Sequence, residues 1–144
     1  MKVIQNPTLP HAIIVDIDGT IADKWARDPY DWSKVSEDTP YTDIITLIMF
    51  FADTPHEIIF VSGRSEECRA DTCDWIGRHT PLWNFELYMR KAWDRRKDSI
   101  IKYEILQDLI KEYYIAYVFD DRDQVVEMWR DAGLRCLQVA PGNF

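Results

Sequence analysis

The 144-residue sequence lacks the features that mark a membrane-spanning or secreted protein. No apolar stretch approaches the length of about 18 residues that a membrane-spanning helix needs. The N-terminus lacks the basic-then-apolar order of a signal peptide, so we expect a cytoplasmic location. Low-complexity tracts and internal repeats are also absent. The length is that of about one domain, spanning residues 1–144, and the 47% hydrophobic content indicates a globular fold.

Cysteine and positive charge are both scarce. Cys68, Cys73 and Cys136 are odd in number and lack zinc-ligand spacing, so we interpret them as reduced thiols. The net charge of −8 disfavours broad nucleic-acid affinity, because phosphate binding depends on Lys and Arg. The segment 90–97 is the exception, with five positive charges and one negative. A solvated surface accounts for this segment as well as a binding site does.

The order of apolar segments predicts the fold class. Short apolar segments predict strands at 12–17, 57–61, 84–89, 114–119 and 134–139, and helical periodicity predicts helices at 44–51, 66–78, 98–113 and 122–132. Such alternation favours an α/β fold, with a parallel sheet covered by helices on both faces. Residues 23–40 are polar and contain two prolines, which predicts a long loop of functional importance.

One short motif dominates the sequence. The run Asp16-Ile17-Asp18-Gly19-Thr20 follows the first predicted strand and enters a glycine turn. Side chains two residues apart on an extended chain point the same way, so Asp16 and Asp18 are expected to face one spot. Two like charges at that separation need a shared proton or a cation between them. A strand that simply ends in an Asp-Gly turn is the alternative, but average residue usage gives this motif about one chance in a thousand.

Two further polar clusters follow predicted strands: Ser62-Gly63-Arg64 and Asp120-Asp121. In a parallel sheet these strand ends lie on one edge, so the sequence predicts that the clusters converge with Asp16. A group of aspartate oxygens without His or Cys suits Mg²⁺. Helix capping is the alternative for Asp120-Asp121. Ser62-Gly63-Arg64 is expected to open a helix whose backbone N–H groups bind an anion.

Lys102 lies one helical turn after Asp98. An ordinary surface ion pair explains this spacing, at about 0.3–0.5 kcal/mol. The functional interpretation is that Asp98 aims the Lys102 ammonium at a phosphoryl oxygen. A carboxylate nucleophile, a second carboxylate for proton transfer, a metal and a cation together describe phosphoryl transfer.

With these motifs the chain resembles the haloacid-dehalogenase-like (HAD) phosphatases, and more narrowly the 3′-phosphatase domain of phage polynucleotide kinase/phosphatases. The resemblance runs from about residue 11 to residue 144. Besides the clusters above, it rests on Ala26-Arg27-Asp28-Pro29-Tyr30-Asp31, Arg96-Lys97-Asp98, Asp120-Asp121-Arg122, Gln124-Val125-Val126-Glu127-Met128-Trp129-Arg130, Gln138-Val139-Ala140 and Gly142-Asn143-Phe144. It implies a Rossmann-like HAD fold with strand order 3-2-1-4-5 and a minimal cap.

The resemblance also implies a role for each matching residue. Asp16 would attack phosphorus, and Asp18 would protonate the leaving oxygen and then activate water. Ser62 and Lys102 would hold the phosphoryl oxygens, with Asp98 orienting Lys102. Substrate contacts would come from Arg27, Gly63, Arg64, Arg96 and Asp98, and Mg²⁺ ligands from Asp16, Asp18 (through its carbonyl), Asp120 and Asp121. The implied activity is Mg²⁺-dependent removal of 3′-phosphates from DNA or RNA ends or from nucleotides.

The sequence leaves other readings open. The substrate of the same chemistry could instead be a free nucleotide or a sugar phosphate, which the net charge slightly favours. A phospho-accepting signalling domain also pairs strand-end carboxylates with a lysine, but Asp18 would give its intermediate a route to hydrolysis. No Gly-x-x-x-x-Gly-Lys-Ser/Thr motif is present, so we expect no 5′-kinase activity and assign any kinase or ligase step to a separate partner. Nothing in the sequence indicates an oligomeric state.

Overall fold

The computed structural model describes residues 2–25 and 27–144, so Ala26 of the motif at 26–31 lies outside the described residues. The strands are β1 (His11–Val15), β2 (Ala22–Asp23), β3 (Thr39–Pro40), β4 (Glu57–Ser65), β5 (Glu86–Arg90), β6 (Tyr114–Asp120) and β7 (Cys136–Gln138). The helices are α1 (Thr42–Ala52), α2 (Arg69–His79), α3 (Asp98–Leu109) and α4 (Asp123–Asp131), with 3₁₀ turns at Trp32–Glu37 and Glu66–Cys68.

Five strands form one parallel sheet in the order β5-β4-β1-β6-β7. Numbered along the chain, this is the predicted order 3-2-1-4-5, which is therefore confirmed. β1 occupies the centre because its Ile and Val side chains are buried on both faces, as a central parallel strand requires.

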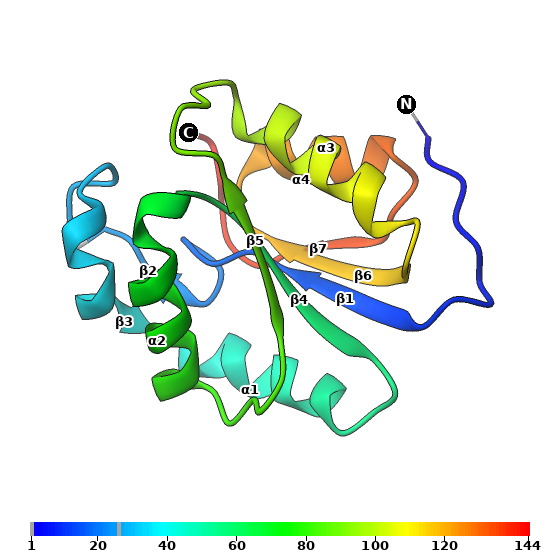
Figure 1. The fold of residues 1–144 in the computed structure, drawn as a ribbon, viewed down its shortest axis with the longest axis horizontal. Helices are drawn as coiled ribbons and strands as arrows, with labels where there is room; N and C mark the ends of the chain where they lie inside the picture. Colours follow the sequence, from blue (N-terminus) through cyan, green and yellow to red (C-terminus); the bar gives the residue numbers. More distant parts are fainter. Residues whose placement is uncertain (1, 26) are drawn as a thin grey trace.

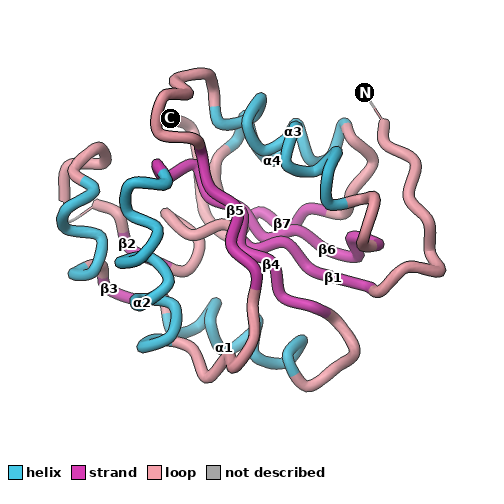
Figure 2. The backbone as a smooth tube through the Cα atoms, in the orientation of Figure 1, coloured by secondary structure: helices cyan, strands magenta, loops and turns pink. Residues whose placement is uncertain are grey.

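Helices cover both faces of the sheet (Figures 1 and 2). Alternate β1 residues point to opposite sides, so Ile13 and Val15 pack with α1 and α2, whereas Ala12 and Ile14 pack with α3 and α4. Two apolar layers thus hold the central strand from either side, which fixes the position of the residues that follow it.

Two local predictions differ from the structure. β4 does not end at residue 61 but continues through Ser62, Gly63 and Arg64 to Ser65, so the expected helix start at Ser62 is wrong. Its pairing with β5 shifts register between Ser62 and Ser65, so Gly63 and Arg64 lie at an irregularity in this pairing. α3 ends at Leu109 rather than at 113, because Lys111 and Glu112 form a turn.

The segment 23–40, predicted as a loop, contains short regular elements. β2 and β3 pair antiparallel, and the 3₁₀ turn Trp32–Glu37 lies between them. This small unit lies beyond the carboxyl ends of the sheet strands, on the side away from the N-terminus (Figure 1). It is a minimal cap, in agreement with the expectation. Among the described residues, no helix has the length and apolar character needed to cross a membrane.

Candidate active site

The central strands bring the two acidic clusters together. β1 and β6 are parallel, with Val15 opposite Phe119, and the Asp16 N–H donates a hydrogen bond to the Phe119 carbonyl oxygen at 2.9 Å. Asp16 and Asp120 therefore emerge side by side at the carboxyl edge of the sheet. The convergence predicted from the sequence is present.

Asp16, Asp120 and Asp121 form a buried carboxylate cluster, with one oxygen of each lying within 4.8 Å of the others. Asp120 is fixed most firmly, because its carboxylate accepts hydrogen bonds from the backbone N–H of Asp121 at 2.9 Å and from the Trp129 indole N–H at 3.1 Å. Thr20 donates to the second oxygen of Asp16 at 3.0 Å.

Lys102 is the counter-charge of this carboxylate cluster. Its ammonium group is buried and lies 2.7 Å from Asp16 Oδ1 and 2.8 Å from Asp120 Oδ2. Lys24 Nζ lies 3.8 Å from Asp121 Oδ2, so two lysines face three carboxylates and excess negative charge remains. Burial raises the pKa of Asp16 well above its usual range and the Asp120 charge raises it further, while burial also raises the pKa of Asp121. A group of hard oxygen donors with excess negative charge fits a divalent metal ion.

Gly19 allows the cluster to close. It has a φ of +83°, which L side chains rarely adopt, and a Cβ at this position would lie 2.1 Å from Asp121 Oδ2. Glycine is thus needed both for the turn after Asp18 and for the approach of the Asp121 carboxylate.

The Asp18 carboxylate is bound by two arginines. The Arg64 guanidinium donates to both of its oxygens, at 2.7 to 3.2 Å, and Arg27 donates to Oδ1 at 3.0 Å. Arg27 and Arg64 both donate also to Asp38, at 2.8 Å at the shortest. Two carboxylates and two guanidinium groups thus form one alternating ion-pair network. The cluster of potential metal-binding side chains does not include the Asp18 carboxylate, and a role for its carbonyl remains a prediction.

Asp98 does not pair directly with Lys102, although the two residues lie only one helical turn apart. Its carboxylate instead binds Arg90, and Arg122 Nη1 donates to it at 2.7 Å. Burial opposes its charge, but Lys102, Arg90 and Arg122 together hold the pKa of Asp98 below its usual range. Two arginines within hydrogen-bond distance therefore take the place of the i,i+4 ion pair expected from the sequence. Asp98 acts on Lys102 only through its field.

Gly63 lies against Asp98. A Cβ on Gly63 would approach the Asp98 oxygens to 2.7 Å, and the Gly63 carbonyl accepts a hydrogen bond from Arg90 Nε at 2.9 Å. Ser62 is buried beside it, and its hydroxyl oxygen accepts from the Arg64 N–H at 3.1 Å. The predicted anion-binding turn is therefore an extended segment clamped by charged side chains.

Arg96, a predicted substrate contact, binds two acidic side chains of the protein. Its guanidinium pairs with Asp94 at 2.7 Å and with Glu104 at 2.6 Å, and 45% of its side chain is exposed. The Arg96 hydrogen bonds lower the pKa of Asp94 to about 2. Part of the positive charge in segment 90–97 is thus neutralised locally, and a substrate contact by Arg96 stays a prediction.

Several residues of the site were not identified from the sequence, among them Arg90, which binds Asp98 and the Gly63 carbonyl oxygen. Asp38 joins the arginine network, Lys24 lies 3.8 Å from Asp121 Oδ2, and Arg122 pairs with Asp98. For Arg122, its place directly after Asp120-Asp121 was the available signal. Asp38 and Lys24 lie in the polar segment 23–40, where nothing in the local pattern separates them from other charged residues.

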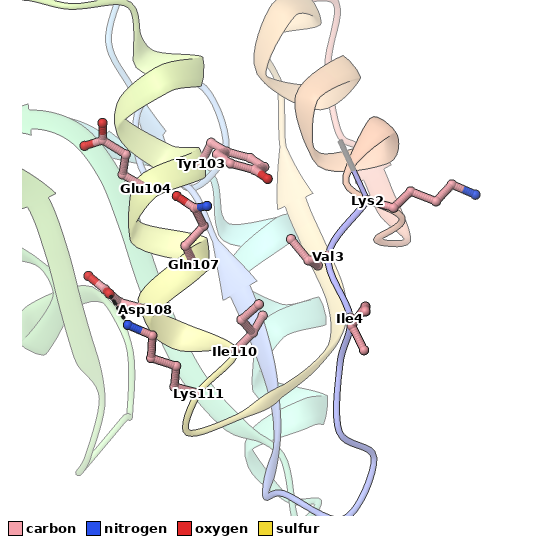
Figure 3. A pocket seen from close by; sticks show the side chains of 9 residues that line it. All are labelled: Lys2, Val3, Ile4, Tyr103, Glu104, Gln107, Asp108, Ile110 and Lys111. Atoms are coloured by element: carbon pink, nitrogen blue, oxygen red, sulfur yellow. Dashed lines mark hydrogen bonds and ion pairs between the residues drawn. The ribbon is translucent and has the colours of Figure 1, made fainter.

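A pocket of about 730 Å³ lies elsewhere, between the N-terminal segment and the C-terminal half of α3 (Figure 3). Val3, Tyr103 and Ile110 line it, with the Asp108–Lys111 ion pair at its rim. It contains none of the predicted site residues, and we assign it no function.

The strand order and the acidic cluster at the end of the central strand are those of the HAD-like phosphatases. The solved structure of the class C acid phosphatase from Bacillus anthracis with tungstate bound shares this fold, with a TM-score of 0.72 at 14% identity over 93% of this chain and 67% of that one. Within the class, residues 10–144 match the family described as the polynucleotide kinase PNKP phosphatase domain. The chain belongs to this family and is a phosphatase domain.

Two relatives contain this domain as part of a longer protein. A putative bifunctional polynucleotide kinase/RNA ligase of Autographa californica nuclear polyhedrosis virus is 37% identical over 125 residues, which are 85% of this chain and 18% of the relative. A chain in the structure of the Pnkp1/Rnl/Hen1 RNA repair complex is 34% identical, with a TM-score of 0.92 over 100% of this chain and 47% of that one. The chain thus spans less than half the length of either relative.

Proposed function

We propose that this protein is a Mg²⁺-dependent phosphomonoesterase that removes 3′-phosphates from polynucleotide ends, through an aspartyl-phosphate intermediate. The carboxylate cluster at the carboxyl edge of the sheet, in a chain that matches a polynucleotide kinase phosphatase domain over residues 10–144, carries the proposal. The two relatives are named for RNA ligase and RNA repair, so we propose RNA ends as the first substrate to test.

In this proposal Asp16 is the nucleophile. One of its carboxylate oxygens attacks phosphorus, forming an aspartyl–phosphate bond while the bond from phosphorus to the 3′-oxygen breaks. The buried position of Asp16, with Thr20 holding one oxygen at 3.0 Å, supports a fixed line of attack. Lys102 already touches the other oxygen, so its ammonium group is close enough to follow the incoming phosphoryl group.

In this proposal Asp18 is first the general acid and then the general base of the reaction. It gives a proton to the leaving 3′-oxygen, then takes one from the water that hydrolyses the aspartyl-phosphate, which releases phosphate and restores Asp16. General acid–base help of this kind contributes about 10²- to 10⁴-fold. Asp18 keeps 23% of its side chain exposed, which is consistent with access to water and substrate. Its partners Arg27 and Arg64 are the proposed substrate-binding arginines.

The metal ligands proposed here are Asp16, Asp120 and Asp121, with the Asp18 carbonyl as a further donor. When bound, Mg²⁺ would supply positive charge for the phosphoryl oxygens and reduce the repulsion between these carboxylates and the substrate. Three carboxylates facing the two lysines Lys24 and Lys102 leave excess negative charge, which supports a cation at this site.

Two further features of the function are proposals of the same kind. A cap built only of β2, β3 and one 3₁₀ turn is too small to enclose a substrate, and we take this to favour polynucleotide ends over small sugar phosphates. A kinase or ligase step would belong to a separate partner or to another part of a longer protein. The three free cysteines are consistent with a reducing, cytoplasmic location.

The test compares hydrolysis of a 3′-phosphorylated oligoribonucleotide, the matching oligodeoxyribonucleotide and a 3′-mononucleotide, each with Mg²⁺ and with EDTA. We expect phosphate release that needs Mg²⁺, prefers the oligonucleotides and weakens with salt, because backbone contacts are electrostatic. Asp16→Asn should be inactive, whereas Asp108→Asn on the outer surface of α3 should not differ from the wild type. An untouched 3′-phosphate would refute the proposal. An aspartyl-phosphate that persists for minutes in the wild type would favour the signalling-domain alternative.

A further inference from the structure

An exposed tryptophan without a role in the chemistry above lies next to Lys24, the lysine that reaches Asp121 of the carboxylate cluster. Trp25 follows β2, and 68% of its surface is exposed. Its backbone N–H donates to Asp23 Oδ1 at 2.9 Å, a turn that holds the residue at the start of the cap. A large apolar ring kept this exposed is a candidate contact surface.

The ring has two neighbours, Phe144, which is distant in sequence, and Lys24, which directly precedes it. Phe144 contacts it edge to face, with 5.8 Å between the ring centroids. Lys24 Nζ lies 3.4 Å from the Phe144 ring centroid and 5.1 Å from that of Trp25. Arg122 Nε donates to the Phe144 carbonyl oxygen at 2.9 Å, which ties this end of the chain to the residue after Asp121. We call Lys24, Trp25 and Phe144 the aromatic platform.

The aromatic platform is connected to the site through Lys24. Lys24 Nζ, which contacts both rings, is also 3.8 Å from Asp121 Oδ2, a member of the carboxylate cluster. One lysine therefore links the platform to the place where the phosphate is processed. A positive group beside aromatic rings is the arrangement that single-stranded nucleic-acid sites use, since every base has a stacking face.

We propose that the aromatic platform binds the nucleobase of the terminal nucleotide, with Trp25 stacking on the base. The proposal rests on the proposed 3′-phosphatase function and makes it more specific: the substrate is recognised by its last base as well as by its phosphate. Lys24 lies between the two binding regions and contributes positive charge to both. Stacking does not depend on base identity, so the platform favours a nucleotide end over a sugar phosphate without selecting a sequence.

The experiment measures kcat/KM on two oligonucleotide 3′-phosphates that differ only at the last position. One carries a purine there, and the other carries a tetrahydrofuran residue that has no base. For the wild type we expect a ratio of about 5 to 150 in favour of the purine end, as base–aromatic stacking provides, and expressed mainly in KM. Trp25→Ala should reduce this ratio to near one. Trp25→Phe should retain part of it, whereas Trp25→Leu should not.

Trp83→Ala is the matched control, because Trp83 is fully exposed in the loop before β5, at the opposite edge of the sheet. It should keep the wild-type ratio. A ratio near one in the wild type, or a Trp25→Ala variant that loses activity equally on both substrates, overturns the platform proposal and leaves the phosphatase function intact. If the wild type hydrolyses neither substrate with Mg²⁺, the proposed function fails and the platform proposal fails with it.

Discussion

Asp38 is the shared partner of the two arginines that bind Asp18, and its removal is the most informative perturbation of the site. Its side chain is only 2% exposed and accepts hydrogen bonds from Arg27 Nε at 2.8 Å and from Arg64 Nη2 at 2.8 Å. The Asp38 carbonyl also accepts from the Trp75 indole N–H at 2.8 Å, which fixes the backbone of this position on α2. The carboxylate is therefore positioned by the fold.

The expected loss of stability follows from the buried arginine charges that Asp38→Ala would leave without one of their partners. Burial raises the pKa of Asp38, and Arg27 and Arg64 offset this only in part, so the ion pairs contribute little net stability as long as they are complete. Removing one partner of such a pair costs about 3–5 kcal/mol, because the remaining charge stays buried. Asp18 still faces both guanidinium groups, so we expect the lower end, about 3 kcal/mol. That corresponds to a decrease in Tm of roughly 6–12 °C.

The assay combines thermal unfolding with kinetics well below Tm. Asp38→Asn, which keeps the shape and one acceptor oxygen, should lose about half as much stability as Asp38→Ala. Both variants should lower kcat/KM about tenfold or more, because Arg27 and Arg64 are no longer held in place. Glu37→Gln is the matched control, an exposed neighbour expected to change stability by less than about 0.5 kcal/mol. If Asp38→Ala has the Tm and activity of the wild type, the ion-pair network does not position the arginines.

Three other predictions test separate parts of the structure. Gly63→Ala should lower the free energy of unfolding in urea by about 1–3 kcal/mol, since its Cβ would lie 2.7 Å from Asp98 Oδ1. Gly77→Ala is the control, because its Cβ has open space around it, and it should stabilise α2 by about 0.5–1 kcal/mol. Burial raises the pKa of the Cys136 thiol to about 12, so the folded state keeps a proton that the unfolded chain loses. The free energy of unfolding should therefore fall as pH rises from about 9 to 12, and it should fall less steeply in Cys136→Ala. Equal slopes of the urea midpoint against pH in the two proteins would contradict this. Asp16→Asn should lower kcat roughly 10⁴-fold or more while keeping the far-UV circular dichroism of the wild type, and residual turnover within tenfold of the wild type would exclude Asp16 as nucleophile.

The strands, the helices and the catalytic edge could be predicted because each depends on local pattern. β1 is recognisable from Ile13, Ile14 and Val15 alone, and the parallel topology then requires that Asp16 and Asp120 share an edge. The extension of β4 through Ser62 could not be predicted, because a serine–glycine pair is equally compatible with a turn. Its extended form depends on pairing with β5, a neighbour set by the fold.

The sequence by itself determined the strands and helices, the acidic motif and the class of chemistry, because apolar periodicity and the spacing of Asp16 and Asp18 are local properties of the chain. The strand order was implied by the resemblance to the HAD-like phosphatases. Only the tertiary structure decided how the charges pair. Lys102 joins Asp16 and Asp120 rather than Asp98, and Asp38 joins Arg64 across 26 positions of sequence. The physical reason is that a buried charge takes the partner that the fold places within hydrogen-bond distance, and the separation of two residues in the sequence does not give that distance.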